Sequence, residues 1–198
     1  LKVGQCCATE CNGLNLKKNV VRVYKQCHVE KCALRRRRGK RGGVRRRVRR
    51  TRIQGRLPLP SVICGNVRSI VNKIDELAAN VCYNNAYKDC CAIFLTETWL
   101  STQVPDACVS LNNFTLVRGD RTEKSGKQRG GGVCMYLNTQ WCSNYVVKHV
   151  SCTADAEILC VQCRPMYLPR EICCVALIVV YAPPNGDKDR AAEAVSEV

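Results

Sequence analysis

Two apolar segments with a helical pattern between them constrain the fold of this chain more than any other feature. Residues 62–66 and 90–96 both read as strands, and the second is largely apolar, as expected of a strand buried on both faces. Ser69 is placed to cap a helix whose apolar face comprises Ile70, Ile74, Leu77, Ala78 and Val81. Strand, helix and strand in this order predict a parallel βαβ unit with a right-handed crossover.

The later chain has the pattern of antiparallel strands. Short connections rich in Gly, Asn, Asp and Pro separate strand-like segments at residues 114–118, 133–138, 145–150, 158–164 and 172–181. A polar, glycine-bearing loop is expected at 119–130, and a helix is expected to begin at residue 188. The predicted class is α/β: half of a two-sheet α/β sandwich, with a mixed sheet that starts as βαβ and then mostly antiparallel strands, truncated at the C-terminus.

The net charge of +16 is concentrated in one segment. Thirteen Lys and Arg and no acidic residue lie between Arg35 and Arg56, whereas the other 19 of the 32 Lys and Arg nearly balance the 16 Asp and Glu. So dense a block cannot bury itself and is expected to be extended and solvated. We therefore predict three parts: a cysteine-rich, poorly ordered segment 1–34, a basic segment with a proline linker 35–60, and a folded domain 61–198.

The basic segment predicts a nucleic-acid partner. A run of cations attracts DNA or RNA phosphates without sequence preference and with salt-dependent affinity, and such runs also direct nuclear import, so we expect an intracellular, nuclear protein. A merely solvated tail is the alternative. The residues expected to contact nucleic acid are Arg35, Arg36, Arg37, Arg38, Lys40, Arg41, Arg45, Arg46, Arg47, Arg49, Arg50 and Arg52.

The 17 cysteines have two interpretations. Their odd number, their adjacent pairs and their places inside apolar segments favour reduced thiols that act as small hydrophobic residues, with no disulfide-linked partner. Such core positions are Cys64, Cys91, Cys134, Cys160 and Cys174. A secreted, disulfide-rich protein is the alternative, and a count of reactive thiols under denaturing conditions separates the two. No apolar run approaches the ~18 residues of a membrane span, so no membrane partner is expected.

Polar residues follow the first two predicted strands directly. Asn66 ends the first strand and Glu97 follows the second. Because adjacent parallel strands end at the same edge of a sheet, we expect Asn66 and Glu97 to lie side by side. A carboxylate in that place can hold a divalent metal against a phosphate.

Six short motifs occur in the order seen in one enzyme superfamily. They are Asn66 after a strand, Leu95-Thr-Glu-Thr-Trp99, Arg118-Gly-Asp-Arg121, Gly130-Gly-Gly-Val133, Arg164-Pro-Met-Tyr-Leu-Pro-Arg170 and Val180-Tyr-Ala-Pro-Pro184. Together they resemble the endonuclease/exonuclease/phosphatase superfamily, and most closely the apurinic-type endonuclease domain of non-LTR (LINE) retrotransposons. The resemblance covers about residues 56–198.

The resemblance implies a two-sheet α/β sandwich that cleaves DNA phosphodiesters with Mg²⁺. The residue matching Glu97 coordinates the metal in that family, the one matching Asn66 orients the phosphate or a metal-bound water, and the one matching Tyr181 contacts the scissile phosphate. Asp120 and Arg121 would fix the loop before the glycines. The preference of Mg²⁺ for one or two carboxylates, waters and substrate oxygens agrees with this assignment.

Two motifs of the family have no counterpart in this sequence. They are a later Gly-Asp-Phe-Asn-type motif and a terminal Asp-His pair, which hold and activate the attacking water. His28 and His149 are poor substitutes, the latter within a predicted strand. We therefore expect a retrotransposon-derived fragment of a Mg²⁺-dependent DNA endonuclease with little or no nuclease activity. The alternative is a non-catalytic protein that binds nucleic acid through residues 35–56.

Three further patterns are weaker. Cys7, Cys11, Cys27, His28 and Cys32 include two pairs four residues apart (7/11 and 28/32), which is compatible with zinc, but their spacing fits no standard finger. The triplet Arg118-Gly-Asp120 resembles an adhesion motif, and Asn113-Phe-Thr115 is a glycosylation acceptor pattern. Both of these require secretion, which no other feature supports.

Overall fold

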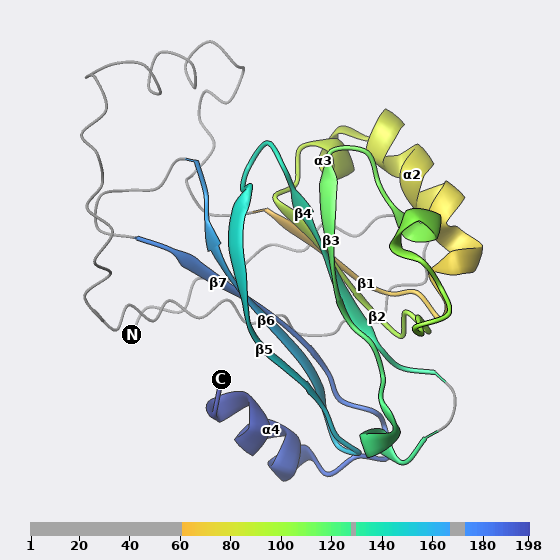
Figure 1. Cartoon of the computed structure of the whole chain (residues 1–198), viewed down its shortest axis with the longest axis vertical. Helices are drawn as coiled ribbons and strands as arrows, with labels where there is room; N and C mark the ends of the chain where they lie inside the picture. Colours follow the sequence, from red (N-terminus) through yellow and green to blue (C-terminus); the bar gives the residue numbers. More distant parts are fainter. Residues whose placement is uncertain (1–60, 128–129, 167–172) are drawn as a thin grey trace.

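Two β-sheets packed face to face form the body of the protein, with helices on the outside (Figure 1). The computed structural model describes residues 61–127, 130–166 and 173–198. One sheet has four strands in the order β1-β2-β4-β3, and the other has three in the order β5-β6-β7. The α/β class and the mixed and antiparallel sheets are confirmed. The cysteine-rich segment, with its candidate zinc ligands, and the basic segment lie outside the described residues.

The first sheet contains the predicted βαβ unit. Its strands are β1 (Val62–Asn66), β2 (Ala92–Thr96), β3 (Phe114–Gly119) and β4 (Val133–Asn138). β1 runs parallel to β2, and β4 is antiparallel to both β2 and β3. The crossover from β1 to β2 consists of a 3-10 turn η1 (Val71–Lys73) and the helices α2 (Ile74–Tyr83) and α3 (Asn85–Lys88).

The start of the crossover differs from the prediction, because Ser69 does not cap a helix. Ser69 has a positive φ of 79°, and its amide donates to the carbonyl of Glu97 at 2.9 Å. The amides of Val67 and Ile70 donate to the carbonyls on either side of Glu97. The chain after β1 thus continues to pair with the chain after β2. An N-cap residue typically has an extended backbone, which Ser69 with its positive φ does not, and the α-helix begins only after η1.

The second sheet is a meander followed by a helix. Its strands are β5 (Asn144–Cys152), β6 (Glu157–Arg164) and β7 (Val175–Tyr181), and α4 (Lys188–Ser196) follows. His149 lies in β5, a strand, as predicted. The register of β5 against β6 shifts between Val147 and His149. The carboxylate of Asp187 caps α4 by accepting from the amides of its first turn.

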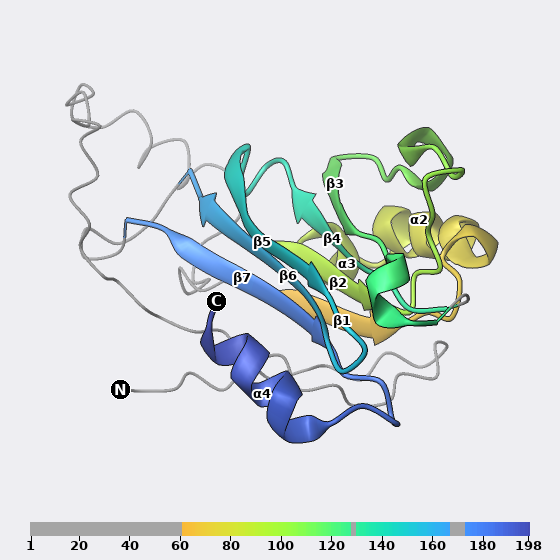
Figure 2. The same cartoon turned by 60° about the horizontal axis from the view of Figure 1, so that its bottom comes forward.

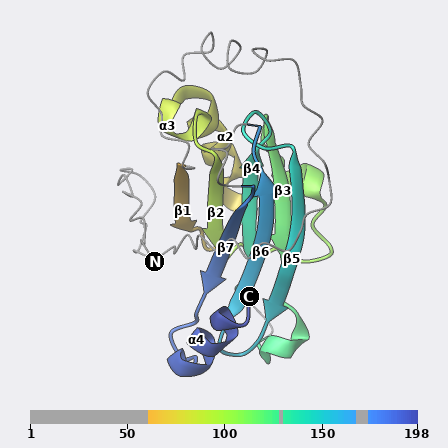
Figure 3. The same ribbon diagram turned by 90° about the vertical axis from the view of Figure 1, so that its left-hand side faces the viewer.

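Alternation along the strands determines which layer each side chain enters. In β2, Ile93 and Leu95 pack with the buried face of α2, whereas Ala92 and Phe94 face the second sheet. Figure 3 shows β5, β6 and β7 lying across the four-stranded sheet. On the far side of the second sheet, Ala191 of α4 packs against β6 (Figure 2). The order of layers is therefore helix, sheet, sheet, helix.

Several cysteines occupy core positions. Cys134 and Cys160 are buried, as their places in apolar segments predicted, and Cys64, Cys91 and Cys174 are half-buried. Burial raises the pKa of the Cys90 thiol to about 12, so this group is a neutral thiol at physiological pH. No helix among the described residues is long and apolar enough to span a membrane.

Candidate functional site

Asn66 and Glu97 lie side by side where β1 and β2 end, as the sequence predicted. The side-chain amide nitrogen Nδ2 of Asn66 donates a hydrogen bond to Oε1 of Glu97 at 2.6 Å. Asn66 is the register partner of Thr96, which directly precedes Glu97. The parallel pairing of β1 and β2 therefore accounts for the contact.

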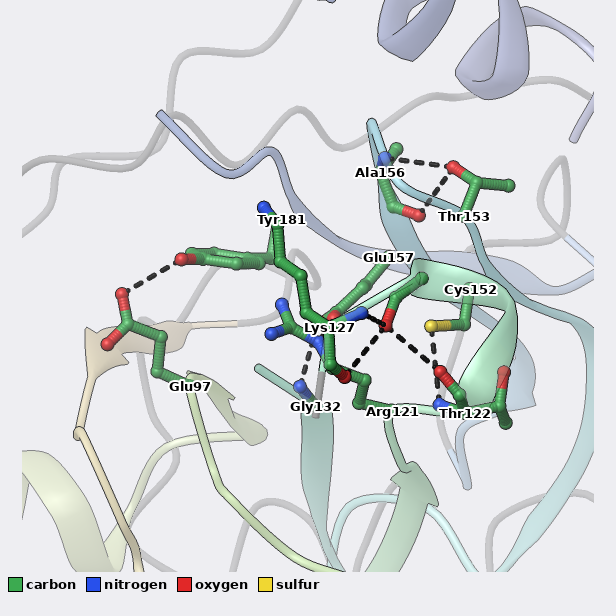
Figure 4. A network of polar contacts seen from close by, with 11 residues as sticks. Glu97, Arg121, Thr122, Lys127, Gly132, Cys152, Thr153, Ala156, Glu157 and Tyr181 are labelled. Carbon is green, nitrogen blue, oxygen red and sulfur yellow. Dashed lines mark hydrogen bonds and ion pairs between the residues drawn. The ribbon is translucent and has the colours of Figure 1, made fainter. Parts of the chain in front are cut away.

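Tyr181 reaches the same carboxylate from the second sheet. Its hydroxyl donates to Oε1 of Glu97 at 3.0 Å (Figure 4). Desolvation by burial, and then the hydrogen bond to Glu97, raise the pKa of Tyr181 to about 12. The phenol is therefore neutral at physiological pH and acts as a donor. Three strands from two sheets thus bring the predicted residues Asn66, Glu97 and Tyr181 together.

The second oxygen of Glu97 is far less engaged. Oε2 lies 3.8 Å from Nε of Arg68, whose side chain is 71% exposed and therefore easily displaced. Nearby, Oδ1 of Asn66 is buried and has no hydrogen-bond partner among the described residues. The hydroxyl of its register partner Thr96 is also buried, and it too lacks a hydrogen-bond partner in the part of the chain that the structure describes. The site thus has one little-engaged carboxylate oxygen, and the Asn66 amide that contacts Glu97 carries a buried, unsatisfied oxygen.

These oxygen atoms fit Mg²⁺, which prefers oxygen ligands and usually keeps several waters. The described residues contain no group of three or more His, Cys, Asp and Glu side chains placed to hold a metal. Any Mg²⁺ bound to Glu97 would therefore need waters or substrate oxygens for most of its remaining ligands. Soft metals such as zinc, which favour thiolate and imidazole, do not match this donor set.

The backbone around Glu97 adopts a rare conformation. Glu97 and Trp99 have φ of 54° and 56°, in the left-handed region that disfavours side chains. Two hydrogen bonds hold the turn: the amides of Thr98 and Trp99 donate to the carbonyls of Gly132 and Gly131 at 3.1 and 2.9 Å. The glycine motif and the Leu-Thr-Glu-Thr-Trp motif, which the sequence separates by some 30 residues, thus pair directly.

The glycines of that motif are required by their surroundings. A Cβ atom at Gly131 would lie 2.0 Å from Cζ of Arg121, and one at Gly132 would lie 2.6 Å from Oγ1 of Thr98. Both glycines also have positive φ. The sequence shows the glycine run as a motif. It does not show that the backbone of this run packs directly against the turn at Glu97, which a side chain at Gly132 would prevent.

Glu157 is a site residue that sequence analysis missed. It is buried, and its Oε1 accepts from Nε of Arg121 at 2.5 Å while its Oε2 accepts from the amide of Gly132 at 2.7 Å (Figure 4). The predicted strand began one residue later, at Ile158. An acidic residue at the head of an apolar strand was the available signal. Its partner Arg121 lies 36 residues away and cannot be identified from spacing.

The two residues expected to fix the loop before the glycines have different partners. Arg121 does so through Glu157, whereas Asp120 pairs with Arg118. Arg118 also donates to Asp106 and to backbone carbonyls of the segment 101–104. Its hydrogen bonds to the carboxylates of Asp120 and Asp106 raise the pKa of the Arg118 guanidinium above its usual value. The Arg118-Gly-Asp120 triplet is therefore engaged inside the fold and is not displayed as an adhesion loop.

The site thus combines a carboxylate held by two neutral donors with a tightly braced turn. No family model and no curated protein matches the chain. What this site does must be argued from its own residues.

Proposed function

We propose that Asn66, Glu97 and Tyr181 form the cation- and phosphate-binding part of a Mg²⁺-dependent DNA endonuclease site, in a protein derived from a retrotransposon. One observation carries the proposal: Oε1 of Glu97 accepts from both Asn66 and Tyr181, while Oε2 has only the weak contact with Arg68 among those recorded for the described residues. The motifs of the sequence support the proposal by their resemblance to the endonuclease/exonuclease/phosphatase superfamily, and the arrangement of these three side chains suits that chemistry.

The two donors orient the carboxylate without neutralising it. Both the amide of Asn66 and the phenol of Tyr181 are neutral, so neither forms an ion pair with Glu97 that would compete with a cation at Oε2. Carboxylates held in this way lose less freedom when they bind a metal. When bound, Mg²⁺ would act as a Lewis acid on the phosphoryl oxygen and stabilise the leaving oxyanion.

Two groups beside Glu97 suit a phosphate. Tyr181 stays protonated up to a pKa of about 12, and its one O–H, which donates to Oε1 of Glu97, could be donated instead to a phosphate oxygen when substrate binds. Asn66 would then hold Oε1 alone. Arg68 carries a positive charge on an exposed side chain next to the carboxylate. Guanidinium groups pair strongly with phosphate oxygens, so this side chain would exchange Glu97 for a substrate phosphate once a cation occupies Oε2.

Cation binding tests the proposal most directly. We expect calorimetric titration of the full chain with Mg²⁺ or Mn²⁺ to show binding, and we expect Glu97→Gln to lose it. The matched control is Glu76→Gln, which changes an exposed glutamate on α2. Equal affinity in the wild type and Glu97→Gln would overturn the cation site, as would absence of binding by the wild type.

A second function is favoured by charge alone. The 13 cations between Arg35 and Arg56 would bind nucleic acid, and direct nuclear import, whether or not the folded domain acts. Deleting residues 35–56 separates the two proposals. If the site at Glu97 contributes, the deletion weakens DNA binding and leaves cation binding intact. If only the basic segment acts, the deletion removes all measurable binding.

A further inference from the structure

Arg121 and Glu157 form a buried ion pair between the segment after β3 and the head of β6. Glu157 is 1% exposed, at the head of β6. Desolvating two charges opposes most of their attraction, and replacing such a pair by apolar residues of similar size is often neutral or stabilising. The pair is therefore better explained by the geometry that it imposes on its neighbours.

A chain of hydrogen bonds runs from Glu157 to the turn that carries Glu97. Oε2 of Glu157 accepts from the amide of Gly132 at 2.7 Å. The carbonyl of Gly132 accepts from the amide of Thr98, the residue after Glu97, at 3.1 Å. A carboxylate of the second sheet thereby reaches the end of β2 in the first sheet.

Arg121, the partner of Glu157, lies against the neighbouring glycine, Gly131. The guanidinium of Arg121 leaves no room for a Cβ atom at Gly131, where the nearest approach would be 2.0 Å. Glu157 holds this guanidinium through Nε. The carbonyl of Gly131 in turn accepts from the amide of Trp99 at 2.9 Å. The pair thus lies against both glycines whose carbonyls bond the Glu97 turn: Glu157 bonds the amide of Gly132, and the guanidinium of Arg121 packs against Gly131.

We propose that Glu157, together with Arg121, is a positioning residue that holds Glu97 in its left-handed turn with Oε2 directed to the cation. The inference rests on the proposed function for its purpose, though the bracing itself is independent of it. A non-glycine residue with positive φ persists only where the surroundings enforce it. Without the brace, the turn relaxes and the carboxylate loses its fixed direction.

The test compares the full chain with the double variant Arg121→Met/Glu157→Leu by amide hydrogen exchange and by Mg²⁺ titration. We expect a folded protein in which the amides of Thr98, Trp99 and Gly132 exchange faster, while the interior of β6 keeps its protection. Partners that orient a metal ligand typically change affinity by roughly 10- to 100-fold when mutated, so Mg²⁺ should bind at least ~10-fold more weakly.

Two single variants serve as rescue and control. Glu157→Gln keeps a carbonyl oxygen for the Gly132 amide but removes the negative charge that pairs with Arg121, so we expect a smaller increase in exchange. It also replaces the double variant if that protein fails to fold. Asp120→Asn weakens the neighbouring ion pair of Arg118, and we expect normal exchange at Thr98 and Trp99.

The outcomes separate this inference from the proposed function. Unchanged exchange at Thr98 and Trp99 in the variants of Glu157 would overturn the brace, whatever the metal does. Faster exchange with unaltered Mg²⁺ affinity would overturn the positioning role, provided that Glu97→Gln abolishes binding. If the wild type binds no Mg²⁺, the proposed function and the positioning role fail together, and exchange alone decides whether the brace exists.

Discussion

Nδ2 of Asn66 and Oε1 of Glu97 lie 2.6 Å apart, although 31 residues separate the two in the chain. The contact follows from the register of β1 and β2, in which Asn66 pairs with Thr96. A shift of one residue would turn Asn66 to the opposite face of the sheet, because side chains alternate along a strand. The parallel register is therefore the element of the fold on which the candidate site depends.

Substituting Asn66 by Asp should make the site more dependent on a cation. The variant places a second carboxylate against Oε1 of Glu97 in place of a donor. Two like charges in contact should destabilise the fold in EDTA and so lower its melting temperature. The lost hydrogen bond alone should lower the free energy of unfolding by about 1–3 kcal/mol. Added Mg²⁺ should then raise the melting temperature more than it does in the wild type.

Asn112→Asp, at an exposed position, is the control for the added charge. Its response to Mg²⁺ should equal that of the wild type. A cation response of Asn66→Asp no larger than that of this control would show that no cation lies between Asn66 and Glu97.

Substituting Tyr181 by Phe should alter both stability and its dependence on pH. The lost hydrogen bond to a charged acceptor should lower the unfolding free energy by about 1.5–3 kcal/mol at pH 7. The pKa of Tyr181 is raised from 10 to about 12, so the folded state favours the protonated phenol. Its contribution is complete below pH 10 and is lost as pH rises towards 12.

Denaturant titrations at pH 7 and pH 11 measure this effect. The difference in stability between wild type and Tyr181→Phe should shrink as pH rises. Tyr83→Phe removes a hydroxyl from a residue that is 90% exposed, and it should change neither quantity. A pH-independent difference would contradict the assigned role of the Tyr181 proton.

Substituting Gly132 by Ala should be much more damaging than substituting Gly126. Both glycines have positive φ, so both variants incur the strain of about 1–2 kcal/mol for a left-handed alanine. Only Gly132 adds a steric conflict, with Oγ1 of Thr98 at 2.6 Å, whereas nothing lies within 4 Å of a Cβ at Gly126.

A double-mutant cycle isolates that conflict. Thr98→Ala removes a buried hydroxyl that has no partner among the described residues, so this change should relieve much of the defect in Gly132→Ala. Unfolding free energies of the four proteins decide the matter. Strict additivity would mean that the close approach of Gly132 to Thr98 does not limit stability.

A fragment of residues 30–60 should bind DNA in a strongly salt-dependent way. Proteins with six to ten phosphate contacts lose roughly 10³- to 10⁵-fold in affinity between 50 and 200 mM salt, and this fragment has at least that many cations. Fluorescence anisotropy with DNA duplexes of unrelated sequences gives the slope. A fragment with glutamine at the basic positions is the control, and affinity that ignores salt would contradict the prediction.

The protein should nick supercoiled plasmid weakly or not at all in Mg²⁺. Glu97 is the carboxylate that contacts Asn66 and Tyr181, and the described residues contain no group of three or more His, Cys, Asp and Glu side chains placed to hold a metal ion. Waters or substrate oxygens would therefore supply most of the ligands of a Mg²⁺ at Glu97. Gel analysis of plasmid relaxation measures nicking, with EDTA as the control. Nicking that EDTA abolishes and Glu97→Gln eliminates would prove this expectation wrong.

Local sequence pattern predicts some elements of this fold correctly and one of them, the start of the first helix, wrongly. The βαβ unit and the meeting of Asn66 with Glu97 were predictable, because apolar periodicity indicates the elements and parallel strands end at a common edge. The cap at Ser69 was predicted wrongly. A backbone bond to the carbonyl of Glu97 replaced the local side-chain bond, which a pattern confined to the helix cannot reveal.

The amino-acid sequence by itself determined the strands, their buried faces and the polar residues at their ends, since these follow from local periodicity and chain direction. Only the tertiary structure decided that Tyr181 reaches Glu97 across 84 residues and that Glu157 meets Arg121 and Gly132. Periodicity states that a side chain faces a core, but the packing of the two sheets determines which atoms meet there. Such contacts depend on the relative placement of the sheets, which no local pattern records.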